Sequence, residues 1–259
     1  MAKLKTRSIF LAVLFTLVLS SAPFSAAFAT GLQPAPDDTF LDEEFDDPFA
    51  EEESSAEISD PIEPVNRAMF WFNDKLYFYL FKPVAKVWRI FPEPMRNATG
   101  RVFDNLGAPV RALNSALQFN LSGTGREVGR FTINTTIGLL GLFDPAKSWF
   151  ELEPQKEDFG QTLGKYGAGP GFYLVLPVFG PSNLRDSVGL VGDYFVDPIS
   201  SPYYFKLKSV EQIALKSTDK VNFLSLDADT YEGIAKESLD PYLTIRSSYT
   251  QYRETLIKD

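Results

Sequence analysis

The sequence predicts a mainly α-helical protein with one domain and little or no β-structure. Of its 259 residues, 44% are hydrophobic and 14% are aromatic, which is enough for the core of one sizeable domain. Beyond residue 60, apolar residues recur at helical spacing in most segments, and no internal repeat is present. Only residues 172–179 have strand character, and Pro177 argues against a strand there.

The first 29 residues are typical of a secretory signal peptide. A basic start is followed by an apolar run from Ile9 to Leu19 and by small residues before a cleavage site after Ala29. The run is shorter than the roughly 20 residues that a transmembrane helix needs. The sequence contains no cysteine, so the exported protein is expected to have neither disulfides nor a lipidated cysteine.

Residues 30–59 are predicted to form an acidic, disordered leader. No Lys or Arg lies between Arg7 and Arg67, and this stretch has too much like charge and too little apolar content to fold alone. It is interpreted as a solvated spacer, with docking to a basic partner as the alternative. From Arg67 onward acidic and basic residues nearly balance, so the domain lacks the basic face of a nucleic-acid-binding protein.

The domain is expected to span residues 60–259, and its first helix to run from Pro64 or Asn66 to about Phe81. The large apolar side chains of this helix point in every direction, which is typical of a helix that is either deeply buried or in contact with lipid. Burying all of them in one domain is hard, because a helix at the edge keeps one side wet. The candidates for membrane contact here are Met69, Phe70, Trp71, Phe72, Tyr77, Phe78, Leu80 and Phe81.

The middle of the domain is predicted to be built from short helices. Two amphipathic helices are expected after Pro92 and Pro94, around residues 102–106 and 110–117. Thr124 and Glu127 match a capping box, which predicts a helix that opens at Thr124.

Residues 137–154 are apolar and interrupted by glycine and proline. Short, bent, Trp-bearing helices suit the plane of a membrane interface, so Trp149 and Phe150 are further candidates for membrane contact.

Three helices are expected in the last third of the chain. One begins at Ser182 and stops at the Asp197-Pro198 pair, because a helix usually ends before the residue preceding a proline. The other two follow from helical spacing of apolar residues across 207–224 and 239–256.

The absence of two residue types excludes several classes of catalytic and metal site. The chain has no histidine and no cysteine, so it offers no His- or Cys-based nucleophile pair and no His or Cys metal site, and no metal or cofactor is expected. Carboxylate chemistry remains open at Asp186, Asp193 and Asp197, whose alternative roles are helix caps and surface charges. Residues 160–166, "GQTLGKY", lack the spacing and the Ser or Thr of a phosphate-binding loop.

Residues 167–186, "GAGPGFYLVLPVFGPSNLRD", are therefore interpreted as an apolar wall rather than as a phosphate cradle or an active-site loop. Proline restricts the chain and glycine permits tight bends at the two ends of the wall. The candidate wall residues are Phe172, Tyr173, Leu174, Val175, Leu176, Val178 and Phe179.

Five stretches together resemble the MlaA family, also called VacJ, from Asp60 to the C-terminus. They are "DPIEPVNRAMFWFN", "RNATGRVFDNLGAPV", "RFTINTTIGLLGLFDPA", "EDFGQTLGKYGAGPGFYLVLPVFGPSNLRD" and "SLDPYLTIRSSY". The resemblance implies a helical ring in the periplasmic leaflet of the Gram-negative outer membrane, with a channel that removes mislocalised phospholipid from the outer leaflet. The implied partners are phospholipid, a porin trimer beside the ring and a periplasmic lipid-carrier protein.

Two features depart from the family pattern: the missing cysteine that many members lipidate, and Pro145, where a small or β-branched residue is expected. Along such a lipid route Arg185 is a candidate for the lipid phosphate, because it follows the wall at the start of a helix. Its alternative is a structural pair with Asp186 or Asp158. Two other functions stay open, a carboxylate-dependent envelope hydrolase and a structural envelope protein associated with porins; the lipid-transfer interpretation predicts no enzyme.

Overall fold

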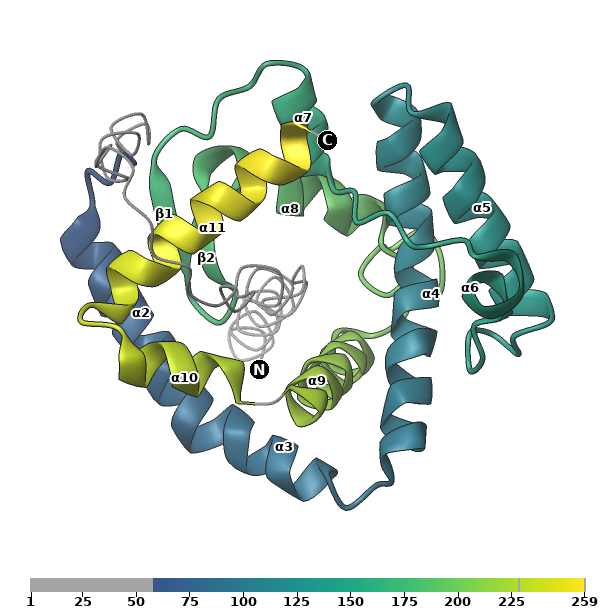
Figure 1. Ribbon diagram of the computed structural model, residues 1–259, viewed down its shortest axis with the longest axis horizontal. Helices are drawn as coiled ribbons and strands as arrows, with labels where there is room; N and C mark the ends of the chain where they lie inside the picture. Colours follow the sequence, from purple (N-terminus) through teal and green to yellow (C-terminus); the bar gives the residue numbers. More distant parts are fainter. Residues whose placement is uncertain (1–57, 228, 259) are drawn as a thin grey trace, which may run out of the picture.

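Helices follow one another around a ring in the computed structural model, which describes residues 58–227 and 229–258 (Figure 1). The predicted signal peptide and almost all of the predicted leader lie outside the described residues. Within them, helices make up most of the chain and the strands belong to one short hairpin, so the prediction of a mainly α fold is confirmed.

One side of the ring is a helical rod made of α2 (Glu63–Leu76), the π-helical turn η2 (Tyr77–Phe81) and α3 (Lys82–Trp88). The predicted start is close to the observed one, but the rod continues beyond Phe81. The wide turn ends two residues before Pro83, which lies in the first turn of α3. Proline has no N–H to donate and crowds the preceding turn, which accounts for the local change of helical pitch.

The opposite side is the long helix α4 (Glu93–Leu117), so the prediction of two separate helices was wrong. Pro109 lies inside α4 and removes one backbone donor, but α4 packs along α5 (Leu121–Thr136) and α9 (Ser209–Leu226), which hold it continuous. The predicted capping box was also wrong. The side chain of Asn120 caps α5 by accepting from the Gly123 N–H at 2.8 Å, and Glu127 is fully buried.

Two short helices follow, α6 (Pro145–Phe150) outside the ring and α7 (Phe159–Lys165) at its top in Figure 1. Pro145, where a small or β-branched residue was expected, occupies the first turn of α6. A backbone N–H in that turn has no partner within the helix, so proline is tolerated there. The side chain of Asp144 caps the helix.

The strands β1 (Tyr173–Leu176) and β2 (Gly180–Asn183) form an antiparallel hairpin, in which Tyr173 pairs with Asn183 and Leu176 with Gly180. The expectation that Pro177 prevents a strand here was wrong, because Pro177 lies in the turn, where no ladder hydrogen bond is needed.

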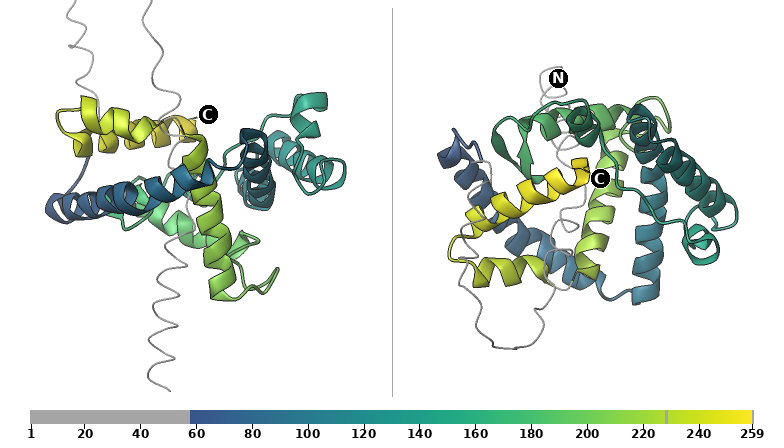
Figure 2. Two further views of the ribbon diagram at one scale, coloured as in Figure 1. Left: turned by 90° about the horizontal axis from the view of Figure 1, so that it is seen from below. Right: turned by 45° about the horizontal axis from the view of Figure 1, so that its top comes forward.

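The last helices are α8 (Leu184–Val196), α9, α10 (Thr230–Glu237) and α11 (Pro241–Lys258). The helix predicted from Ser182 begins two residues later, with Asn183 as its cap, and α10 was not predicted. Figure 2 shows α9 running across the plane of the ring while α10 and α11 lie together on one side of it.

The helices α7 and α8 cross at a glycine contact. A Cβ added at Gly189 would lie 2.4 Å from the backbone nitrogen of Gly160, so a larger residue at Gly189 would force the two helices apart. This contact places the N-terminus of α7 directly over α8, where the polar cluster described below forms.

Candidate functional site

Polarity in this fold is reversed compared with an ordinary soluble domain. Among the described residues, buried polar and charged side chains outnumber buried apolar ones, and large apolar side chains are exposed on most helices. Examples are Ile90, Trp71 and Trp149, which are 81%, 63% and 66% exposed. Soluble monomers rarely expose extended apolar patches, so this surface requires apolar surroundings or a partner.

The predicted membrane-contact residues divide into two groups. Half of them are exposed: Trp71, Phe72, Leu80, Trp149 and Phe150. The other half are partly buried: Met69, Phe70, Tyr77, Phe78 and Phe81. Of these, Phe70, Tyr77 and Phe78 pack against the buried pair Tyr231 and Ile245, while Met69 packs against the second core cluster, which includes Tyr173 and Tyr242. The core interpretation of this helix therefore holds for the partly buried residues that pack in the core, whereas membrane contact of the exposed group stays a prediction.

Two asparagines of α2 hold the hairpin in place, and sequence reasoning missed both. Asn66 donates to the carbonyl oxygen of Tyr173 and accepts from the N–H of Val175, both at 2.9 Å. Asn73, two turns later on the same face, donates to the Leu176 carbonyl at 2.9 Å and accepts from the Val178 N–H at 2.7 Å. The sequence feature that could have indicated this role is the spacing of seven between the two asparagines, which places them on one face of the helix.

The tip of the hairpin is strained. Val178 has φ +71°, a left-handed conformation that a β-branched residue rarely adopts. Its hydrogen bond with Asn73 helps to hold the backbone in this conformation. Strain of this kind persists only where the surroundings over-determine it, and it often marks a functional position.

An apolar pocket lies between the hairpin tip, the rod and helices α9 to α11. The empty space between its lining residues, counted together with the part that is open to solvent, is about 550 Å³. Its lining residues are Phe70, Asn73, Leu76, Tyr77, Phe81, Val175, Val178, Phe179, Gly180, Pro181, Lys220, Leu224, Tyr231 and Ile245. The hairpin tip and α9, which form part of this pocket, lie toward the inner side of the ring in Figure 1.

The structure brings only part of the predicted apolar wall to this pocket. Val175, Val178 and Phe179 line it, together with the predicted membrane-contact residues Phe70, Tyr77 and Phe81. Tyr173 instead belongs to the core, and the half-buried Phe172, Leu174 and Leu176 are not among the lining residues. The pocket thus joins segments that are about 100 residues apart in sequence, which the sequence pattern did not indicate.

Lys220, on α9, is the charged member of the pocket lining among the described residues. Its ammonium nitrogen lies 5.9 Å from the centroid of the Phe223 ring. Burial lowers the pKa of Lys220 to about 8, against the opposing influence of Asp219. Burial likewise raises the pKa of Asp219 to about 6. The pocket therefore combines apolar walls with a poorly hydrated cation.

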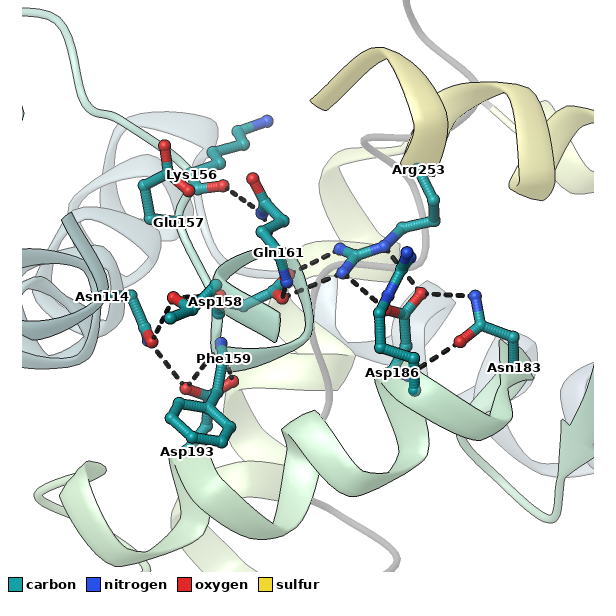
Figure 3. A network of polar contacts seen from close by, with 12 residues as sticks. Asn114, Lys156, Glu157, Asp158, Phe159, Gln161, Asn183, Asp186, Asp193 and Arg253 are labelled. Atoms are coloured by element: carbon teal, nitrogen blue, oxygen red, sulfur yellow. Dashed lines mark hydrogen bonds and ion pairs between the residues drawn. The ribbon is translucent and has the colours of Figure 1, made fainter. Parts of the chain in front are cut away.

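A second, fully polar cluster closes the ring where α11 meets α7 and α8 (Figure 3). Arg253 contacts both oxygens of Asp158 at 2.5 and 2.9 Å and both oxygens of Asp186 at 2.8 and 3.0 Å. Asn183 and Tyr249 each donate to Asp186 as well, at 2.8 and 2.7 Å. We call these five residues the polar lock.

In the polar lock, charge pairing changes the pKa values of Arg253 and Asp158 more than burial does. Burial alone lowers the pKa of Arg253, but Asp158 and Asp186 raise it overall. Burial alone raises the pKa of Asp158, but Arg253 lowers it overall. Arg253 and Asp158 are therefore held as an ion pair inside a hydrogen-bonded network.

Arg185 adopts the structural alternative that the sequence left open. It is only 8% exposed, and its Nε donates to Asp186 at 2.9 Å. A lipid phosphate would have to compete with this buried pair, so a headgroup contact of Arg185 stays a prediction that the geometry does not favour.

The three candidate carboxylates, two in α8 and one directly after it, do not converge on a shared site. Asp186 belongs to the lock, whereas Asp193 accepts from Asn114 at 2.9 Å and from the Phe159 N–H at 3.2 Å. Asp197 accepts from Lys216 at 2.8 Å and caps the turn that follows α8. Each carboxylate has its own structural partners, and the paired arrangement that a hydrolase would need is not formed by these three residues.

Asp193 gives a pH prediction. Burial, together with nearby Asp158, raises the pKa of Asp193 to about 7. The folded state then binds more protons than the unfolded state from about pH 4 to pH 7, so the stability contributed by this group falls as pH rises through that window. Replacing Asp193 with Asn is expected to remove this slope and to stabilise the protein at pH 8 by about 1 kcal/mol or more.

Denaturant unfolding at several pH values between 5 and 8 measures the slope. The matched control is Asp197→Asn, at the residue that directly follows α8. Although burial raises the pKa of Asp197, its pairing with Lys216 lowers it overall, so this variant is expected to lose stability at pH 8. A pH slope in Asp193→Asn as steep as that of the unmodified protein would contradict the raised pKa.

Within the described residues no helix is both long enough and apolar enough to cross a membrane. Fold and surface together define a class of protein: a helical ring with its polar side chains inside and large apolar side chains outside. A family model described as MlaA lipoprotein matches residues 58–256. The chain belongs to the MlaA lipoprotein family.

Individual relatives agree with this assignment. An uncharacterized protein of Rickettsia bellii is 37% identical over 207 residues, which cover 78% of each chain. The intermembrane phospholipid transport system lipoprotein MlaA of Escherichia coli is 36% identical over 199 residues, 74% of this chain and 76% of the relative. A solved structure reported as "Structural basis for maintenance of bacterial outer membrane lipid asymmetry" matches with a TM-score of 0.64 and 33% identity, covering 77% of this chain and 99% of that chain.

Proposed function

We propose that this protein removes mislocalised phospholipid from the outer leaflet of the outer membrane and passes it to a periplasmic lipid carrier. The observation that carries the proposal is the reversed polarity, because large apolar side chains on most helices suit a ring that lies in lipid. The Escherichia coli relative is named for phospholipid transport between membranes, and the structural match was reported for outer-membrane lipid asymmetry.

The mature protein, from about Thr30, is proposed to be held in the periplasmic leaflet by its apolar surface alone. The Escherichia coli relative is named a lipoprotein, but this sequence contains no cysteine that could carry a lipid. Exposed aromatic and aliphatic side chains on the rod and on α6 would provide the anchoring contacts. A porin trimer beside the ring is proposed as the lateral partner.

The route for the lipid is proposed to pass the inner side of the ring, where the apolar pocket offers contact for an acyl chain. Transfer requires no bond to be made or broken, so we propose no catalytic role. Apolar contact of moderate strength is suited to transfer, because a lipid that is bound too tightly would not leave.

The test is a deletion strain with a membrane-impermeant, amine-reactive label for phosphatidylethanolamine at the cell surface. Deletion is expected to increase surface labelling, and the wild-type gene is expected to restore the original level. Unchanged surface labelling together with altered porin levels would instead support a structural envelope protein. Loss of a hydrolytic product from envelope glycan or lipid would support the hydrolase.

A further inference from the structure

We propose that the loop between α8 and α9 anchors the protein in the headgroup region of a membrane that carries anionic phospholipid. This inference rests on the proposed function, because it requires that the ring lies in lipid. The tip of this loop is a surface that we call the aromatic loop, formed by Pro202, Tyr203, Tyr204, Phe205 and Lys206. Aromatic rings beside basic residues suit the boundary between headgroups and acyl chains, so the occupant of this surface is lipid.

Three consecutive aromatic side chains of the aromatic loop are exposed. Tyr203, Tyr204 and Phe205 are 73%, 53% and 61% exposed. The loop lies at the N-terminal end of α9 and projects out of the plane of the ring (Figure 2). Such a run is unfavourable in water, because each ring leaves much of its apolar surface unburied. The described fold therefore leaves an apolar tip that another apolar phase has to cover.

The fold holds the two ends of the loop together. The side-chain amide of Gln212 donates to the carbonyl oxygens of Ser200 and Leu207, both at 3.3 Å. On the N-terminal side, Asp197 accepts from the hydroxyl of Ser200 at 2.9 Å and from the ammonium of Lys216 at 2.8 Å. A loop whose ends are close and whose base is buried presents its tip as a defined surface, and loops of this kind are frequently functional.

The charges around the aromatic loop favour an anionic surface. Lys206 and Lys208 are exposed, and residues 198–208 include no acidic residue. Neither ammonium forms an ion pair with another described residue, whereas the exposed Lys147 of α6 pairs with Glu153 at 3.0 Å. A tyrosine keeps its ring in lipid and its hydroxyl among the headgroups, and a lysine beside it reaches the phosphates. Lysines near an anionic membrane strengthen attachment, so the loop adds an electrostatic component to the apolar contacts of the ring.

The first test measures where the loop lies in the full chain. Because the sequence has no cysteine, Tyr204→Cys gives a single attachment point for a fluorophore. The labelled protein is bound to vesicles of phosphatidylethanolamine and phosphatidylglycerol that contain a nitroxide either near the headgroup or deep in the acyl chains. The headgroup nitroxide is expected to quench the label about twofold more strongly than the deep one.

Two results of this test would overturn the proposal. Stronger quenching by the deep nitroxide would place the loop where its lysines cannot reach the phosphates. No quenching by either nitroxide would place the loop outside lipid and would favour a protein partner for it. If Tyr204→Cys does not fold, Tyr203→Cys at the more exposed neighbouring position answers the same question.

The second test removes the charges. Lys206→Gln combined with Lys208→Gln is expected to weaken binding to vesicles that contain phosphatidylglycerol about tenfold, and to leave binding to pure phosphatidylcholine vesicles unchanged. High salt should abolish the difference. The matched control is Lys86→Gln combined with Lys147→Gln, which removes two exposed lysines outside the loop. Equal weakening in both double variants would indicate a general effect of net charge and would overturn the assignment to the loop.

A label on the rod separates this inference from the proposed function. Trp71→Cys reports whether the exposed face of the rod lies in lipid, independently of the loop. If the label on position 71 is quenched and the label on position 204 is not, the loop inference is wrong and the proposed function stands. If neither label is quenched, the ring does not lie in lipid, and the proposed function is wrong as well.

Discussion

Replacing Arg253 with methionine is expected to lower the free energy of unfolding by about 3–5 kcal/mol. Arg253 is 7% exposed and bridges Asp158 and Asp186 with all of its terminal nitrogens. Without it, Asp158 keeps a partly buried charge that has lost its Arg253 partner, whereas Asp186 still has Arg185. Because the lock joins α11 to α7 and α8, its loss would open the ring. Denaturant unfolding of the full chain measures the effect.

The effect of Arg253→Met should depend on pH. Without the guanidinium, the pKa of Asp158 is expected to rise above its unfolded value, so the variant should become less stable as pH increases from 5 to 8. Adding Asp158→Asn should recover part of the lost stability, since asparagine can still cap α7 by accepting from the Gln161 N–H.

Arg67→Met is the matched control for Arg253→Met. Arg67 also bridges two acids, Glu63 and Asp240, but its side chain is 40% exposed, so about 1 kcal/mol is expected for its removal. Equal losses for Arg67→Met and Arg253→Met would show that the lock is no stronger than a surface ion pair.

The fold class could be predicted because periodicity is a local property. Helical spacing indicated most of the helices, and Asp197-Pro198 marked the end of α8. Boundaries were wrong where tertiary contacts override local signals. Pro109 did not interrupt α4, because α4 packs along α5 and α9. Glu127 pairs with Arg111 in the interior instead of capping a helix, and periodicity contains no information on that choice.

The sequence predicted some of the residues of the candidate site but not how they are brought together. The sequence indicated an apolar wall and an all-round apolar helix, and the structure shows that parts of both line one pocket. Which face of the rod turns inward depends on the hydrogen bonds that Asn66 and Asn73 make with β1, over 100 residues away in sequence. The sequence pattern did not indicate Lys220 as a site residue, because a lysine on an amphipathic helix is usually a solvated charge.

Replacing Trp71, Phe72 and Leu80 together with glutamine is expected to weaken binding to phospholipid vesicles about 100-fold. These side chains of the rod are 63%, 42% and 49% exposed, and transfer of each into lipid is worth about 1 kcal/mol at that exposure. Glutamine is a good helix former, so the thermal unfolding of the protein should change little. Flotation with vesicles of phosphatidylethanolamine and phosphatidylglycerol measures the binding.

The control for the triple variant is Lys86→Gln, an exposed position on the same rod, which should bind vesicles as the unmodified protein does. Phe70→Gln gives the opposite control, because Phe70 packs against both core clusters and its loss should destabilise the fold. Lower vesicle binding with unchanged stability in the triple variant can then be assigned to the outer face of the rod. Full vesicle binding by a well-folded triple variant would mean that this face does not contact lipid, and would favour a protein partner such as a porin on it.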